Sequence, residues 1–170
     1  MARLLVRKIA QNDNTAVAEV IRTVMPEFGA VGPGYSIEDA EVDTMFEAYQ
    51  GIQKAFYVVV TAGKVVGCGG VAPLDGGQED VCELKKMYFL SEARGRGAGR
   101  VLAELLINDA RKLGFNKIYI ETLQQMEAAN GLYKSLGFQK IDGPLGNTGH
   151  CGCDTHYLLE LQPLEEVSIG

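Results

Sequence analysis

Hydrophobic residues recur with two different periods along this chain, which predicts strands interleaved with helices. Apolar positions three and four residues apart fall in residues 17–24 and 101–113, the spacing of one buried helix face. Residues 36–49, which open with a capping-box-like pattern, and residues 126–138 predict two further helices. The first helix is expected to stop at Pro26, because proline ends most helical runs.

Runs rich in β-branched and aromatic residues predict the strands. The longest, residues 55–74, predicts a hairpin that turns near Ala62–Gly63. Inside it the pair Gly69–Gly70 predicts a bulge or a close approach of another backbone segment. Further strands are expected over residues 3–9, 81–90, 116–122 and 153–161.

The order of these elements predicts the fold class. No repeat, low-complexity tract or linker interrupts the series, which indicates one domain spanning residues 1–170. The expected class is α/β or α+β, with a mostly antiparallel sheet and helices on its faces. A content of 46% hydrophobic and 22% charged residues is ample for a globular core.

Charge and composition exclude several functional classes. The net charge of −6 argues against a nucleic-acid partner, because phosphate-backbone binding relies on clustered cations. No apolar run approaches the roughly 18 residues of a membrane span, and the N-terminal segment lacks a signal-peptide core. We therefore expect a cytoplasmic protein with no membrane partner, whose four cysteines are free thiols.

The segment from Arg94 to Arg100 places three arginines and three glycines directly before a predicted helix. A helix N-terminus favours anions, and glycines let a ligand approach the backbone N–H groups closely. Arginines become favourable there once a phosphate is bound. The glycine spacing fits neither a dinucleotide fingerprint nor a Walker A loop. A small polyanion is therefore the expected ligand, with a solvated surface turn as the plainer alternative.

The pattern R-x-x-G-x-G, formed by Arg94, Gly97 and Gly99, resembles the acyl-CoA loop of the Gcn5-related N-acetyltransferases, the GNAT superfamily. The preceding ELKKMYF is similar to the central strand of that family, and NGLYKSLGF at residues 130–138 to its second signature. The resemblance covers most of the chain and is weakest between residues 26 and 49. It implies a GNAT fold of six to seven strands and about four helices.

The same resemblance implies direct acetyl transfer from acetyl-CoA to a primary amine, with a homodimer as a plausible assembly. The acceptor stays open among a small molecule, an amino acid, a polyamine and a protein N-terminus. The pyrophosphate would be bound along the turn, pantetheine along the central strand, and the thiol end near the second signature. The implied cofactor residues are Arg94, Gly95, Arg96, Gly97, Ala98, Gly99 and Arg100; Met87, Tyr88 and Phe89; and Asn130 and Tyr133.

Amide formation needs a base for the amine and an acid for the departing thiol. Glu83 is the expected base, because burial within its strand would raise the pKa of its carboxyl group. A structural ion pair with Lys85 or another cation is the alternative for Glu83. Tyr133 matches the general acid of the family, and the alternative for it is a purely structural core tyrosine.

The segment GHCGCDTH holds two cysteines and two histidines within residues 149–156 and suggests zinc. The C-x-C spacing and the closeness of the second ligand pair disfavour a structural zinc site, so no metal is expected. His150 or His156 is expected to line the acceptor pocket or to be purely structural. Cys82 is not expected to carry an acyl group, since no histidine is near it in sequence.

The role of an acidic run and the functional class of the protein both have rival interpretations. An acidic run could attract a cationic amine, although such a run is more often the solvated face of an amphipathic helix. A non-catalytic CoA-binding sensor or regulatory module is the alternative to an enzyme, and a metal-binding protein built on HCGC is a more distant one. The acidic residues are Glu38, Asp39, Glu41, Asp43 and Glu47.

Overall fold

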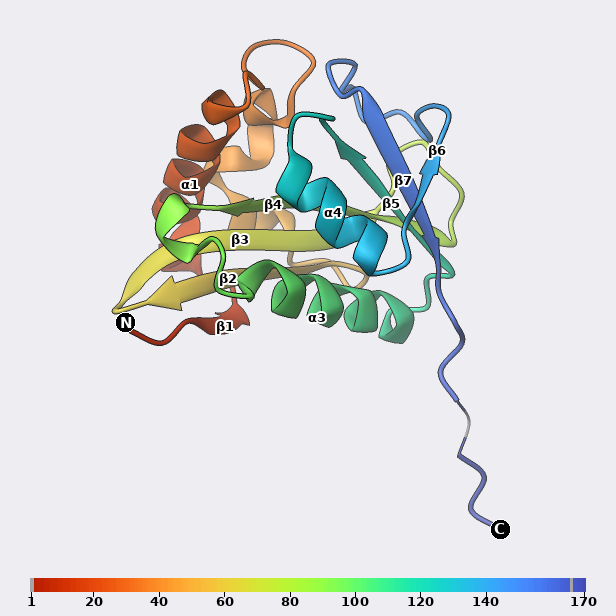
Figure 1. Cartoon of the computed structure of the whole chain (residues 1–170). Helices are drawn as coiled ribbons and strands as arrows, with labels where there is room; N and C mark the ends of the chain where they lie inside the picture. Colours follow the sequence, from red (N-terminus) through yellow and green to blue (C-terminus); the bar gives the residue numbers. More distant parts are fainter. Residues whose placement is uncertain (1, 166) are drawn as a thin grey trace.

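The computed structural model describes residues 2–165 and 167–170 and contains one seven-stranded sheet (Figure 1). The strand order is β1-β2-β3-β4-β5-β7-β6, and every neighbouring pair is antiparallel except β4 and β5. The predicted sheet is thus confirmed. The strands are β1 (Leu5–Lys8), β2 (Ala55–Thr61), β3 (Lys64–Pro73), β4 (Val81–Phe89), β5 (Lys117–Thr122), β6 (Gln139–Ile141) and β7 (Thr155–Glu160).

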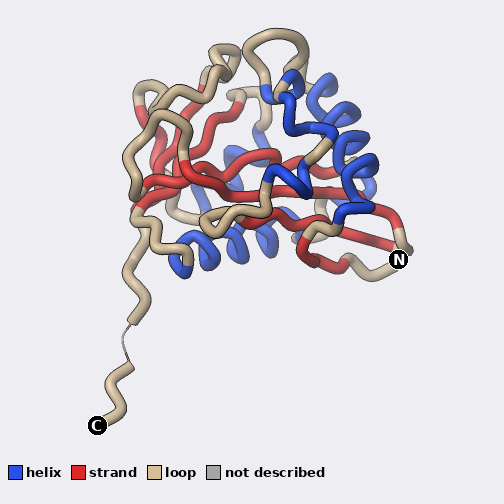
Figure 2. Tube along the Cα trace, turned by 180° about the vertical axis from the view of Figure 1, so that it is seen from behind, coloured by secondary structure: helices blue, strands red, loops and turns tan. Residues whose placement is uncertain are grey.

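Helices cover both faces of the sheet. The helices α3 (Ala98–Lys112) and α4 (Glu127–Ser135) pack on one face in a core that includes Leu102 and Leu106. The helices α1 (Asn14–Glu27) and α2 (Met45–Ala48) pack on the other face in a second core. Figure 1 shows α3 and α4 in front of the sheet, and Figure 2 shows the opposite side. Alternate strand residues serve the two cores, as the period of two requires.

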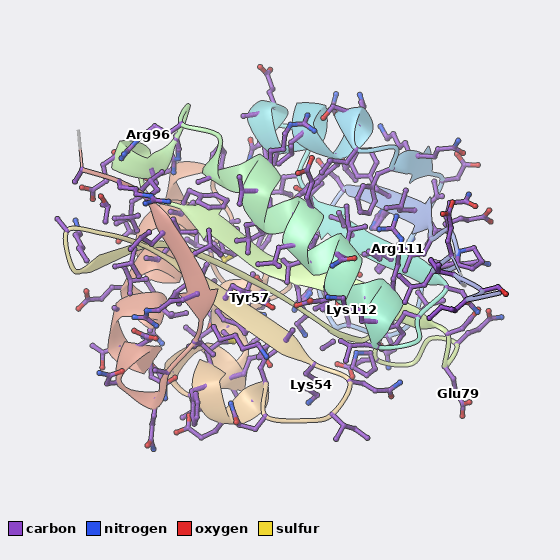
Figure 3. All side chains as sticks on the ribbon, turned by 90° about the horizontal axis from the view of Figure 1, so that it is seen from below. Lys54, Tyr57, Glu79, Arg96, Arg111 and Lys112 are labelled. Atoms are coloured by element: carbon purple, nitrogen blue, oxygen red, sulfur yellow. The ribbon has the colours of Figure 1, made fainter. Side chains whose placement is uncertain are left out.

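Turn and cap chemistry explains several boundaries. The β2–β3 hairpin turns at Ala62 and Gly63, both with positive φ, which confirms the predicted position. Gly137 has a φ of 96° after α4, and the N–H of Phe138 donates to the carbonyl of Tyr133 in the expected left-handed cap. Arg111 and Lys112 lie at the C-terminal end of α3, where cations are favourable (Figure 3).

Two helix predictions need correction. Residues 36–49 do not form one helix but two 3₁₀ turns, Ser36–Glu38 and Ala40–Asp43, followed by the short α2. Asp39 is extended between the turns, where its carboxylate meets buried cations, and this tertiary contact overrides the local helical pattern. Pro26 does not stop α1, which continues to Glu27.

The β3–β4 pairing has a bulge opposite Gly69–Gly70, as predicted, but the bulged strand is β4 rather than β3. Cys68 pairs with Tyr88 and Gly70 with Lys85, so the additional residue belongs to β4. There Lys86 takes a φ of 59°, in the left-handed region. The predicted close approach is confirmed, because a Cβ at Gly70 would lie 2.7 Å from the carbonyl oxygen of Ala55.

Candidate active site

A cleft opens where β4 and β5 diverge. The two strands pair only from Val81–Lys117 to Glu83–Tyr119, so β4 has no β5 partner beyond Glu83. The inner cavity, about 50 Å³, lies near Glu83 at the start of this divergence. The outer cavity, about 320 Å³, continues along Met87 toward the glycine–arginine turn and α4. Tyr133 lines both cavities and therefore marks their junction.

Glu83 is buried at the inner end of the cleft and is 4% exposed. Burial raises the pKa of its carboxyl group to about 7, and the neighbouring charge of Lys85 only partly opposes this shift. Its carboxylate has no hydrogen-bond partner among the described residues, while Lys85 Nζ lies 3.5 Å from Glu41 Oε1. The structure thus brings Glu83 into the cavity and gives no support to the alternative pair with Lys85.

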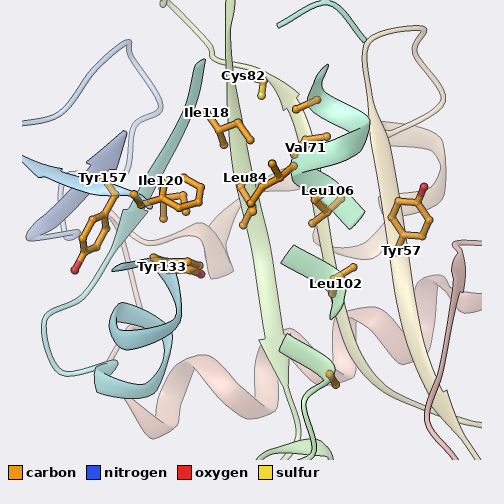
Figure 4. Close-up of a cluster of buried hydrophobic side chains, with 14 of the residues drawn as sticks. Tyr57, Val71, Cys82, Leu84, Leu102, Leu106, Ile118, Ile120, Tyr133 and Tyr157 are labelled. Atoms are coloured by element: carbon orange, nitrogen blue, oxygen red, sulfur yellow. The ribbon is translucent and has the colours of Figure 1, made fainter. Parts of the chain in front are cut away.

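Tyr133 reaches the junction of the two cavities from α4. Its ring packs against Tyr157 and Phe138, with centroid separations of 6.0 and 5.8 Å (Figure 4). Burial raises the pKa of its phenol above the ordinary value, so the hydroxyl keeps its proton at neutral pH. Tyr133 is therefore a core residue that also lines the cleft with a protonated phenol.

The glycine–arginine turn forms one wall of the outer cavity. Gly95 and Gly97 have φ values of 69° and 81°, and Gly97 is the N-cap of α3. No side chain in the described part of the chain caps this helix, which leaves the N–H groups of its first turn available for an anion. Met87, Tyr88 and Phe89 of β4 line the same cavity.

The three arginines do not behave alike. Arg94 lines the outer cavity, donates from Nε to the carbonyl of Phe89 at 2.9 Å and pairs with Glu27 at 2.8 Å. Arg96 donates to the carbonyls of Ala2 and Glu92 and lies beside rather than in the cavity lining (Figure 3). Arg100 donates to Ser135 Oγ at 2.6 Å, also outside the lining. Gly95, Gly97, Ala98 and Gly99 complete the lining from this turn.

Asn130 is buried but does not line either cavity. Its side-chain amide donates to the carbonyls of Leu123 and Met126, both at 2.9 Å, and its oxygen accepts from the hydroxyl of Tyr157. The side chain therefore fixes the connection from β5 to α4. It would act on a cofactor only by holding α4 in place.

A charged cluster that the sequence analysis did not assemble lies at the inner cavity. Lys86 is fully buried and pairs with Asp39 at 2.5 Å and with Glu41 at 3.0 Å. His150 Nε2 lies 2.9 Å from Asp39, and His150 Nδ1 lies 3.2 Å from Glu121. The solvated-face interpretation of the acidic run is therefore wrong for Asp39 and Glu41, which are half-buried and paired.

The cluster shifts the pKa values of its members. Burial lowers the pKa of the His150 imidazole, but hydrogen bonds to Asp39 and Glu121 outweigh that effect and raise it to about 9. Burial raises the pKa of Asp39, yet His150 and Lys86 bring it down to about 2. The acidic run and the histidine-containing segment were both visible in the sequence. The contact between Asp39 and His150, which are 111 residues apart, could not be inferred from the sequence.

The cysteine residues are placed away from reactive roles. Cys151 is exposed, whereas Cys153 lines the inner cavity. Burial raises the pKa of the Cys82 thiol to about 12, which agrees with the expectation that it carries no acyl group. His156 is buried and stacks on Tyr119 with a centroid separation of 6.2 Å. Of this segment, His150 and Cys153 line the inner cavity, whereas Cys151 is exposed.

Residues 17–138 match the Acetyltransferase (GNAT) family. The chain belongs to the GNAT family of acetyltransferases. YjgM of Escherichia coli K12, an uncharacterized N-acetyltransferase, is 42% identical to this GNAT protein over 158 residues, which cover 92% of this chain and 95% of YjgM. These relations identify an N-acetyltransferase. An IAA acetyltransferase of Azospirillum brasilense is 36% identical over 95 residues, covering 55% of this chain and 60% of the relative.

Two solved structures share the fold of this GNAT protein. The acetyltransferase YncA of Salmonella typhimurium, solved with its cofactor acetyl-CoA, superposes with a TM-score of 0.76 at 22% identity and covers 94% of each chain. The phosphinothricin acetyltransferase of Sinorhizobium meliloti, in complex with acetyl-CoA, gives a TM-score of 0.75 at 19% identity, covering 96% of this chain and 95% of that one. The GNAT fold prediction is confirmed. Within the described residues, no helix has the length and apolar character of a membrane span.

Proposed function

We propose that this enzyme transfers an acetyl group from acetyl-CoA directly to a primary amine, with Glu83 as the base and Tyr133 as the acid. The observation that carries the proposal is the position of these two side chains in one continuous cleft. Glu83 lines its inner cavity, and Tyr133 lines the inner and outer cavities alike. A carboxylate with a pKa of about 7 is matched to proton removal at neutral pH.

Several features of the outer cavity fit acetyl-CoA. The edge of β4 beyond Glu83 is free to hydrogen-bond an extended pantetheine, and the uncapped start of α3 can bind a pyrophosphate. Arg94 adds a cation at the same wall. YncA and the phosphinothricin acetyltransferase, which share the fold, were both solved with acetyl-CoA. When bound, acetyl-CoA supplies an activated thioester as the acyl donor.

The residues of the chain then have distinct tasks. Glu83 accepts a proton from the incoming ammonium group and frees the nitrogen lone pair. A backbone N–H group of β4 beyond Glu83, where this strand has no β5 partner, would bind the developing oxyanion. Tyr133 donates its phenolic proton to the departing thiolate and regains a proton from the attacking nitrogen as the amide forms, while Glu83 releases its proton to solvent. The acceptor amine enters at the inner cavity, where the carboxylates of Glu83 and Glu121 lie in the lining.

The test is a panel of amines supplied with acetyl-CoA, with free-thiol release as the readout. Wild type should turn over at least one amine, and Glu83→Gln should not, while Glu79→Gln provides an exposed acid-to-amide control (Figure 3). Acetyl-CoA at 100 times its Kd should add about 2.7 kcal/mol of stability. Stabilisation without turnover of any amine would instead support the CoA-sensor alternative. No stabilisation by any acyl-CoA would contradict the cofactor assignment.

The homodimer and the cytoplasmic location stay predictions. Light scattering on the purified chain tests the first, and cell fractionation tests the second.

A further inference from the structure

Three potential metal ligands converge at the inner cavity. One carboxylate oxygen each from Glu83 and Glu121 and one ring nitrogen of His150 lie within 4.8 Å of one another. They come from β4, from β5 and from the connection between β6 and β7. Two carboxylates and one imidazole form a ligand set that suits Zn²⁺.

Each of two ligands is already oriented by a second group. Asp39 lies 2.9 Å from His150 Nε2 and holds the ring so that Nδ1 is the nitrogen that faces Glu121. The hydroxyls of Tyr119 and Thr148 donate to Glu121 at 2.9 and 2.8 Å. Metal-binding histidines are normally hydrogen-bonded to a carboxylate, and metal-binding carboxylates normally accept hydrogen bonds from other side chains.

The space between these atoms requires a positive charge. His150 Nδ1 lies 3.2 Å from the Glu121 carboxylate, so either a proton or a metal ion must lie between these two atoms. Glu83 is buried without a hydrogen-bond partner among the described residues, which is costly for a carboxylate. The cluster holds four carboxylates, which include those of Asp39 and Glu41, against three basic side chains, those of Lys85, Lys86 and His150.

We propose that Glu83, Glu121 and His150 form a Zn²⁺ site that inhibits the enzyme when it is filled. The ion takes the place of a proton at His150 Nδ1 and ties up the oxygen lone pairs of Glu83. Binding itself does not depend on the catalytic assignment, whereas inhibition rests on the proposed role of Glu83 as the base. The imidazole ligand selects against Mg²⁺, which prefers oxygen ligands and keeps its waters.

The test is calorimetric titration of the chelator-treated full chain with ZnCl₂, without acetyl-CoA or amine. Wild type should bind one equivalent. Loss of an outer partner of a metal ligand costs roughly 10- to 100-fold in affinity, so Glu83→Gln, which removes a ligand, should weaken binding at least about 100-fold. The side chain of Glu83 holds no described hydrogen bond, so this variant should fold normally. Glu79→Gln and Cys151→Ser should bind zinc as wild type does, and MgCl₂ should not compete.

Substitution with Co²⁺ gives a second readout, because thiolate ligands add strong near-ultraviolet absorption that nitrogen and oxygen ligands do not. Absence of saturable binding, unchanged affinity in either Glu83→Gln or His150→Gln, or a thiolate signature that disappears in Cys151→Ser would each overturn the site. Lost acetyl transfer in Glu83→Gln with unchanged zinc affinity refutes only the metal site. Lost zinc binding with unchanged acetyl transfer refutes only the catalytic role of Glu83.

Discussion

The two cavities of the cleft are built by different means. The outer cavity is formed by glycines, apolar side chains and backbone groups of β4, α3 and α4, which are close in sequence to a recognisable motif. The inner cavity is lined by charged side chains whose partners are distant in sequence, such as Asp39 and His150. Backbone recognition suits a constant donor, whereas a side-chain network can be altered residue by residue to suit an acceptor.

The largest effect is expected at the inner cavity. Glu83→Gln should reduce kcat by about 100- to 10,000-fold, the usual contribution of a general base. In wild type, kcat/KM should rise with pH through about 7, because the base must be deprotonated to act. The Kd of acetyl-CoA should not change, since Glu83 does not line the outer cavity. An equal loss in acetyl-CoA affinity would remove the distinction between the cavities.

The charged network should also make stability depend on pH. Because the folded-state pKa of His150 is about 9, above the ordinary 6.5, its contribution is complete below pH 6.5 and is lost as pH rises through 9. Over that window its contribution should fall by as much as about 3 kcal/mol. Denaturant unfolding of wild type and His150→Gln at several pH values measures it.

His156→Gln provides a matched control for that measurement. His156 stacks on Tyr119 and makes no ion pair in the described part of the chain, so its variant should keep the pH slope of wild type. The raised pKa of Glu83 also makes the free energy of unfolding fall as pH rises, but at lower pH. Both wild type and His150→Gln contain Glu83, so its contribution cancels when one curve is subtracted from the other. An unchanged slope in His150→Gln would contradict the ion pairs of the inner cavity.

Tyr133 lies at the junction and should give an intermediate result. Tyr133→Phe keeps the packing against Tyr157 and Phe138 and removes only the donor, so kcat should fall by roughly 10- to 100-fold, less than the full range for acid catalysis because thiolate is a good leaving group. Acetyl-CoA affinity, measured by calorimetry, should change less than threefold, about 0.6 kcal/mol. An unchanged kcat would leave Tyr133 a structural residue.

The smallest effect is expected in the outer cavity. Gly97→Ala places a Cβ at a φ of 81°, which costs about 1–2 kcal/mol in the left-handed region and should favour a relaxed turn. Binding of acetyl-CoA must then return the turn to its strained conformation, and this free-energy cost should raise the Kd of acetyl-CoA about tenfold. The kcat at saturation should stay near that of wild type.

Gly63→Ala is the matched control, because Gly63 has a φ of 77° and, like Gly97, no atom within 4 Å of an added Cβ. It lies in the β2–β3 hairpin, outside both cavities, so it should lower Tm without altering acetyl-CoA binding. Equal effects of the two variants on Kd would mean that the turn has no special part in binding.

Much of the fold could be read from local pattern. The hairpin at Ala62–Gly63, the helix after Gly97 and the cap at Gly137 each depend on conformations that neighbouring residues dictate. The helix predicted over residues 36–49 failed because Asp39 gains more from Lys86 and His150 than from a helical backbone. A contact between residues that are distant in sequence does not change the local pattern of hydrophobic residues, so it cannot be predicted from that pattern.

The sequence by itself determined the family, and it supplied the turn proposed to bind the donor and the two side chains proposed for catalysis, because these depend on short motifs whose chemistry is local. Only the tertiary structure decided which groups surround Glu83. The divergence of β4 and β5 leaves it buried without a partner, and His150 and Glu121 are brought beside it from distant segments. Electrostatic interactions depend on distance in space, and the sequence records only distance along the chain.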